Sequence, residues 1–248
     1  MRWGAVFGAA GLLLVVAASS RKASAAASDF GGGSSPSGDW RVDVSPATRE
    51  LRGDDARRRL RGMAESLERR YGIRGLADYL DATASTETGR TYAAKVHGDI
   101  GSKMGDSIGL FQMKTTTAFK SSDGLKHLQH TSVGERMLET PDLAVIFAAN
   151  HAVQAVKWAR RYGDDKSPCG AGGPGDWIAV RRWWKYPRRV YDWCESEAGS
   201  TKTRERFERA LDFIGVPHSF MYREPPINGW PGIDKVLEDY GITVPRSA

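Results

Sequence analysis

The chain has 248 residues, of which 40% are hydrophobic and 27% are charged. This length and composition are typical of a soluble, folded protein with one large or two small domains, and they exclude a disordered or coiled-coil chain. The formal net charge is +6, but Arg2, Arg21 and Lys22 supply half of it, so the rest lacks the strong basic excess usual in nucleic-acid-binding proteins.

The N-terminus has the order of a secretory signal peptide. Arg2 precedes an uncharged run over residues 3–18, and the small residues 23–27 (ASAAA) offer an Ala-x-Ala cleavage site. Arg21 and Lys22 lie between the uncharged run and the small residues. This position leaves an uncleaved membrane anchor as the alternative. We therefore expect an exported protein, periplasmic or extracellular, with residues 1–27 as signal peptide or anchor.

Residues 28–46 predict a flexible linker, because their Gly- and Ser-rich run has too little apolar surface to offset the entropy lost on ordering. Residues 46–71 carry apolar side chains at a broken helical period, and their arginines alternate with acids. This pattern indicates an ion-paired helix with a solvated face. Residues 76–84 (LADYLDATA) predict a second helix.

A third helix is expected from Pro141 to Tyr162. Thr140 is a capping residue, Pro141 suits the first turn, and Asp142 favours the positive end of the helix. Asn150 falls in the apolar stripe of this helix, where a buried amide must find hydrogen-bond partners, so we expect it to be structural.

Residues 176–193, interrupted by Pro187, form another helix-like block, and helices are also expected over residues 203–214 and 232–240. No segment shows sustained two-residue alternation, so the sequence predicts a mainly α fold with little or no sheet. The chain has two cysteines, Cys169 and Cys194, which in an exported protein predict a disulfide.

Residues 84–119 carry the candidate chemistry. Glu87 is expected just past a helix end near Ala84, and the turn Gly109-Leu110-Phe111-Gln112 follows a Gly-rich loop. A carboxyl placed against an apolar turn is poorly solvated and holds its proton more tightly, so it can protonate a leaving oxygen. Gln112 can bind a sugar hydroxyl or amide. By spacing alone, however, a Glu after a helix is usually a solvated surface acid.

This segment resembles the SLT (soluble lytic transglycosylase) domain of the lysozyme-like superfamily. The resemblance covers residues 75–165 and rests on Glu87-Thr88-Gly89, Gly109 to Gln112, Thr117-Ala118 and Asn150. It implies a lysozyme-like helical catalytic domain over residues 47–195, with residues 196–248 as a helical extension packed on it.

The chain departs from the family pattern in two places. The gap from Glu87 to Gly109 is 22 residues, longer than in most members, and the later Tyr-Asn-x-Gly signature is not evident. Trp183, Trp184 and Tyr186 lie in roughly its place. These aromatic side chains can stack on sugar faces or pack between helices.

The resemblance implies peptidoglycan as substrate and partner, cut at the β-1,4 bond between N-acetylmuramic acid and N-acetylglucosamine. Glu87 would protonate the glycosidic oxygen and then act as base while the muramyl 6-hydroxyl attacks, which gives a 1,6-anhydro product. Thr88 and residues 109–112 would contact the substrate. This route needs one carboxyl group and no metal or cofactor.

Three alternatives stay open. A hydrolytic, lysozyme-type muramidase needs a second acid. Asp99 and Asp106 are the nearest in sequence, although each lies beside Gly, where a turn role is the default. A non-catalytic cell-wall-binding module would keep the groove without the reaction. A nucleic-acid-binding protein could use the arginines of residues 57–61, but the export signal and the small remaining charge argue against it.

Overall fold

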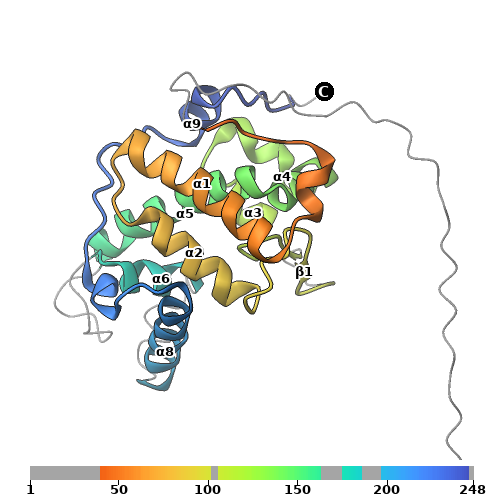
Figure 1. Ribbon diagram of the computed structural model, residues 1–248. Helices are drawn as coiled ribbons and strands as arrows, with labels where there is room; N and C mark the ends of the chain where they lie inside the picture. Colours follow the sequence, from red (N-terminus) through yellow and green to blue (C-terminus); the bar gives the residue numbers. More distant parts are fainter. Residues whose placement is uncertain (1–39, 102–105, 163–174, 186–196, 246–248) are drawn as a thin grey trace, which may run out of the picture.

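The computed structural model describes residues 40–101, 106–162, 175–185 and 197–245 (Figure 1). The predicted signal segment, residues 28–39 of the predicted linker, Cys169, Cys194 and Tyr186 lie outside the described residues. The linker prediction is wrong for residues 40–46, which pack on the core: Val42 is buried, and the Asp43 N–H donates to Asp142 Oδ2 at 2.9 Å. The described part is mainly helical, as predicted. Its strands are β1 (His97–Gly98) and β2 (Ser107–Ile108), which pair antiparallel with His97 opposite Ile108.

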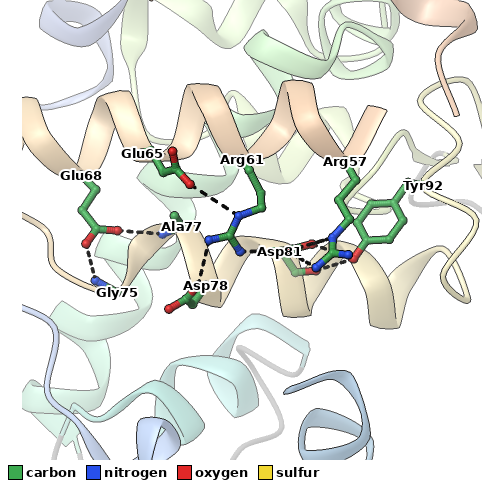
Figure 2. Close-up of polar contacts among 9 residues, drawn as sticks. All are labelled: Arg57, Arg61, Glu65, Glu68, Gly75, Ala77, Asp78, Asp81 and Tyr92. Carbon is green, nitrogen blue, oxygen red and sulfur yellow. Dashed lines mark hydrogen bonds and ion pairs between the residues drawn. The ribbon is translucent and has the colours of Figure 1, made fainter. Parts of the chain in front are cut away.

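The first two long helices lie antiparallel, side by side (Figures 1 and 2). The expected helix over residues 46–71 is divided into the 3-10 helix η1 (Pro46–Glu50) and α1 (Gly53–Tyr71), because Leu51 is extended. Gly72 ends α1 in the left-handed conformation, with φ 68°, which glycine adopts without a Cβ clash. The second helix is α2 (Leu76–Glu87).

The helix α5 (Pro141–Tyr162) has the predicted bounds, and it packs against α1, α2 and α4 (Ser132–Glu139). Its start differs in detail from the expected cap. The Thr140 hydroxyl donates to the Arg136 carbonyl at 2.8 Å, and the fully buried Asp142 is ion-paired with Arg59 of α1. Asp142 therefore fixes α1 on α5 in addition to complementing the helix end.

The segment between β2 and α5 holds α3 (Thr115–Ala118) and the 3-10 helix η2 (Asp123–Leu128). The helix α6 (Trp177–Lys185) packs on α5, and α8 (Glu197–Ile214) begins six residues before its predicted start. They are followed by the 3-10 helix η3 (His218–Tyr222) and by α9 (Ile233–Asp239).

The C-terminal elements share the core of the preceding helices. The cluster of buried residues that includes Leu60 and Phe147 also includes Phe207 of α8, Leu237 of α9, and Trp230 from the segment before α9. In Figure 1, α8 lies below α2 and α6, and α9 lies at the opposite end of the molecule. None of the helices in the described ranges is both long and apolar enough to cross a membrane.

Candidate active site

Glu87 is the last residue of α2, so the helix continues three residues past the predicted end near Ala84. The cause is Thr88, whose backbone N–H and hydroxyl both donate to the Ala84 carbonyl, at 2.9 and 2.8 Å. The Thr88 hydroxyl also accepts from the backbone N–H of Tyr92 at 3.1 Å. Thr88, expected to contact substrate, therefore ties the loop after Glu87 to the helix.

The Glu87 side chain is 10% exposed and forms an ion pair with Arg181 of α6. Arg181 Nη2 lies 2.5 Å from Glu87 Oε1, and the Arg181 side chain is 4% exposed. The carboxyl is thus sheltered from water, as the sequence predicted. The tighter hold on the proton that was predicted for Glu87 is opposed by the Arg181 guanidinium at this distance, because it stabilises the ionised carboxylate.

Arg181 was missed as a site residue, although the sequence carries a signal for it. Trp177, Val180, Arg181 and Trp184 are spaced i, i+3, i+4 and i+7, so the arginine falls in the apolar face of its helix. All four are buried. A charged group in such a face must find a counter-charge, because burying it alone is strongly unfavourable.

Apart from an interaction between the Tyr79 and Thr83 hydroxyls, three buried polar atoms near this ion pair have no hydrogen-bond partner within the described residues. They are the Tyr79 hydroxyl, the Thr83 hydroxyl and Arg181 Nη1. Thr83 lies one helical turn before Glu87, and Tyr79 lies one turn before Thr83. Burial raises the pKa of Tyr79, so its hydroxyl stays neutral. Unpartnered buried polar atoms are rare in folded proteins, and a cluster of them is a sign of a site that meets a polar ligand.

The predicted turn at residues 109–112 is held by its own backbone and side chains. Gly109 has φ 72° and its N–H donates to the Val96 carbonyl at 2.9 Å. Gln112, with φ 47°, donates from Nε2 to the carbonyls of Gly109 at 3.0 Å and Val96 at 3.3 Å. Its Oε1 lies against Gly98. The Gln112 amide, expected to bind sugar, therefore holds this turn against β1.

Of the aromatic residues that could stack on sugars or pack between helices, Trp183 and Trp184 are buried and pack inside the protein. Trp184 contacts His151, Tyr79 and Phe111, with ring centroids 4.7, 6.3 and 6.1 Å away, and Trp183 packs on Trp158 at 5.9 Å. Leu110 and Phe111 are also buried. Trp184 thus connects the turn at residues 109–112 with the helix that carries Arg181.

Asn150 is buried in α5, and its amide is hydrogen-bonded at both ends. Its Nδ2 donates to the Ser121 hydroxyl at 2.7 Å, and its Oδ1 accepts from Trp230 Nε1 at 3.1 Å. These contacts join α5 to the segment after α3 and to the C-terminal region. They are the partners that a core amide requires.

The acids weighed as a second carboxylate take part in the β1–β2 hairpin. Asp99 accepts from the Ser107 hydroxyl at 2.8 Å, and Asp106 Oδ2 lies 3.5 Å from His97 Nδ1. His97 Nε2 lies 2.9 Å from Glu139. Although desolvation lowers the pKa of His97, its hydrogen bonds to Glu139 and Asp106 outweigh it and raise that pKa.

No group of three or more His, Cys, Asp or Glu side chains in the described part of the chain is placed to hold a metal ion. Comparison with protein-family models, with curated proteins and with solved structures gives no match. The functional assignment of the site therefore rests on the residues described above.

Replacing Gly109 with alanine is expected to lower the free energy of unfolding by about 3 kcal/mol. A Cβ there would lie 2.1 Å from the Leu138 carbonyl oxygen, and φ 72° disfavours any side chain. Gly89→Ala is the matched control, because Gly89 has φ 57° with nothing within 4 Å, so only about 1 kcal/mol is expected. Urea denaturation measures both, and equal losses would contradict the close contact.

Asp176→Asn is expected to stabilise the protein above pH 7 by on the order of 2 kcal/mol. Asp176 precedes α6 and accepts from the Ala179 N–H at 2.8 Å, and its buried Oδ2 has no hydrogen-bond partner among the described residues. Burial raises its pKa from 3.8 to about 6, against the opposing effects of the Ala179 N–H and Arg182. Asparagine keeps the acceptor and removes the buried charge.

The pH dependence of this effect has a definite sign. Because the folded-state pKa is raised, the stabilising contribution of protonated Asp176 is complete below pH 3.8 and is lost as the pH rises through about 6. Wild type and Asp176→Asn should therefore have similar stability near pH 4, diverge as the pH rises to about 6, and differ by a constant amount above it. A difference in stability that is independent of pH would contradict this account.

Proposed function

We propose that the protein is a peptidoglycan lytic transglycosylase, which cleaves the β-1,4 bond between N-acetylmuramic acid and N-acetylglucosamine with Glu87 as acid and then base. The observation that carries the proposal is the sheltered Glu87–Arg181 pair, in which Arg181 Nη1 is buried with no hydrogen-bond partner among the described residues. The resemblance of residues 75–165 to SLT domains supplies the reaction. The substrate lies outside the cytoplasm, in agreement with an export signal in residues 1–27.

The ion pair assigns a role to Arg181 in this scheme. Arg181 stabilises the Glu87 carboxylate, which is the form that accepts the proton of the muramyl 6-hydroxyl in the second step. For the first step Glu87 must carry a proton, so Arg181 must turn to another acceptor. A substrate hydroxyl or acetamido oxygen is such an acceptor, and Arg181 Nη1 is already without a partner among the described residues. Arg181 is therefore a positioning residue.

The single-carboxylate route is favoured over two-carboxylate hydrolysis by the hairpin contacts. Asp99 bonds to Ser107 and lies 3.4 Å from Lys114, and Asp106 contacts His97 and the Gly101 N–H. Each acid thus has a structural role that explains its presence. Attack by the muramyl hydroxyl requires no activated water and hence no second acid.

Mass spectrometry of muropeptides after digestion of cell-wall sacculi tests the proposal. Wild type should release fragments with 1,6-anhydro ends, and Glu87→Gln should lower their yield at least a hundredfold, because the acid and the base are both lost. Glu238→Gln is the matched control, since Glu238 is 72% exposed on α9. Thermal unfolding checks that the variants are folded.

The other outcomes identify the alternatives. Reducing ends in place of anhydro ends would show a hydrolytic muramidase. Retention on sacculi without any product, equal in wild type and Glu87→Gln, would show a wall-binding module. Either outcome contradicts the transglycosylase proposal.

A further inference from the structure

The outward surface of α8 is divided by charge. Positions 202, 206, 209 and 213 are spaced by four, three and four residues, so they share one flank of the helix. That flank carries Lys202, Arg206, Arg209 and Phe213, whereas the adjacent flank carries Glu205, Glu208 and Asp212. The face opposite the basic flank is buried and includes Phe207 and Leu211.

Two acids of the adjacent flank pair with residues other than the cations of the basic flank. Glu208 pairs with Arg204 at 3.6 Å, and Asp212 pairs with His218 at 2.8 Å. Within the described residues, no ion pair involves Lys202, Arg206 or Arg209, and all three side chains are exposed. An anion can therefore bind them without breaking an existing ion pair.

The basic flank continues into the loop that follows Glu87. Phe213 is 40% exposed, and the Arg90 guanidinium lies over its ring at 4.9 Å from the centroid. The guanidinium of Arg57 lies at 5.4 Å from the same centroid. Arg90 is exposed, has no ion pair among the described residues, and is three positions after Glu87 in the chain. We call Lys202, Arg206, Arg209 and Arg90 the basic strip.

We propose that the basic strip binds the carboxylates of the peptide stems of peptidoglycan while the glycan strand lies at Glu87. This inference rests on the proposed function, since Arg90 brings the strip to the loop behind the candidate acid. At about 1.5 Å rise per residue, the cations at positions 202 to 209 extend roughly 10 Å along α8, and Arg90 beside Phe213 continues the row. A row of exposed cations of that length suits a ligand with several separated carboxylates better than a single small anion.

An acidic lipid surface is the competing ligand for an exposed basic face with an aromatic residue. The contacts of Phe213 disfavour it. The guanidinium groups of Arg57 and Arg90 lie against its ring, and the ring stacks on Tyr92 with centroids 6.4 Å apart. A ring in contact with two guanidinium groups would have to give up these contacts to insert into acyl chains.

Binding is tested in a full-length Glu87→Gln background, so that cleavage does not interfere. The strip variant is Lys202→Gln/Arg206→Gln/Arg209→Gln. The matched control is Arg69→Gln/Arg74→Gln/Lys120→Gln, which removes the same charge from exposed positions elsewhere. The probes are soluble glycan strands that carry peptide stems, the same strands after an amidase has removed the stems, and vesicles of equal parts phosphatidylglycerol and phosphatidylcholine.

The strip variant should bind stem-bearing strands about tenfold more weakly than its parent at low salt, and the difference should shrink as salt is added. It should bind stem-free strands as its parent does, and the control variant should match its parent on both. Equal binding of stem-bearing strands by the strip variant and its parent would overturn the inference. So would a loss confined to vesicles, which would indicate a membrane surface.

The outcomes separate this inference from the proposed function. If wild type yields no cleavage products, the transglycosylase proposal fails, while the binding comparison still reports on the strip. If wild type gives anhydro products but the strip substitutions leave binding unchanged, the inference fails and the proposed reaction stands.

Discussion

Asp81→Ala is expected to lower the free energy of unfolding by about 3 to 5 kcal/mol. Asp81 is fully buried in α2 and accepts from Arg57 Nε at 3.1 Å, Arg61 Nη1 at 2.9 Å and the Tyr92 hydroxyl at 2.6 Å (Figure 2). Alanine would leave two partly buried guanidinium groups without their shared counter-charge and would leave the Tyr92 hydroxyl without this acceptor. Urea denaturation measures the loss.

Neighbouring substitutions provide the controls. Asp78 is 34% exposed and pairs with Arg61 at 3.1 Å, so Asp78→Ala should lower stability by less than about 1 kcal/mol. Tyr92→Phe removes one hydrogen bond to Asp81 and should lower it by about 1 to 2 kcal/mol. If Asp81→Ala were no more damaging than Asp78→Ala, the buried network would not be holding α1 on α2.

The Asp81 network also bears on the candidate site. Tyr92 follows the loop that begins at Thr88. Its hydroxyl donates to Asp81 and so attaches the end of that loop to the middle of α2. Glu68 fixes the other end of α2, because its carboxylate accepts from the N–H groups of Gly75 and Ala77 at 2.9 and 3.1 Å (Figure 2). The helix that ends in Glu87 is therefore anchored at its start, its middle and its end.

The helices that could be predicted with correct bounds are those whose signals are local. Pro141 at the start of α5 and the apolar period after it suffice for its start and length. The end of α2 could not be placed in the same way. Thr88 extends the helix through a side-chain bond to Ala84, whereas the sequence pattern favoured a stop at Ala84. The sequence also left α4 unassigned, although Thr131 caps it by accepting from the Gly134 N–H at 3.0 Å.

The candidate site was predictable in part. A motif resemblance singled out Glu87, but its partner lies 94 positions away in the chain. Helical spacing indicates that Arg181 is buried and needs an acidic partner. The spacing does not indicate which Asp or Glu of the chain is that partner. The roles of Trp183 and Trp184 were open for a related reason, since an aromatic residue on a helix face fits both a core and a binding surface. Only the packing of α6 against α5 decides between them.

Arg181→Met is expected to destabilise the protein by about 3 to 5 kcal/mol, because it leaves the Glu87 carboxylate buried without its guanidinium. Methionine fills much of the volume and cannot pair with an acid. Glu87→Gln/Arg181→Met removes both charges, so its loss should be smaller than the sum of the two single losses by at least about 2 kcal/mol. Urea denaturation of wild type, both single variants and the double variant gives this coupling energy.

Arg181→Lys then tests whether the Arg181 side chain has a role in the reaction or only supports the fold. Lysine keeps the positive charge. It lacks the planar guanidinium, which can donate hydrogen bonds to Glu87 and to a substrate oxygen at the same time. We expect a stability close to wild type but a kcat for release of anhydro fragments at least tenfold lower, because the acid is held without being correctly placed. Wild-type kcat in Arg181→Lys would show that the guanidinium only supports the fold, and additive losses in the double variant would show that Glu87 and Arg181 are not coupled.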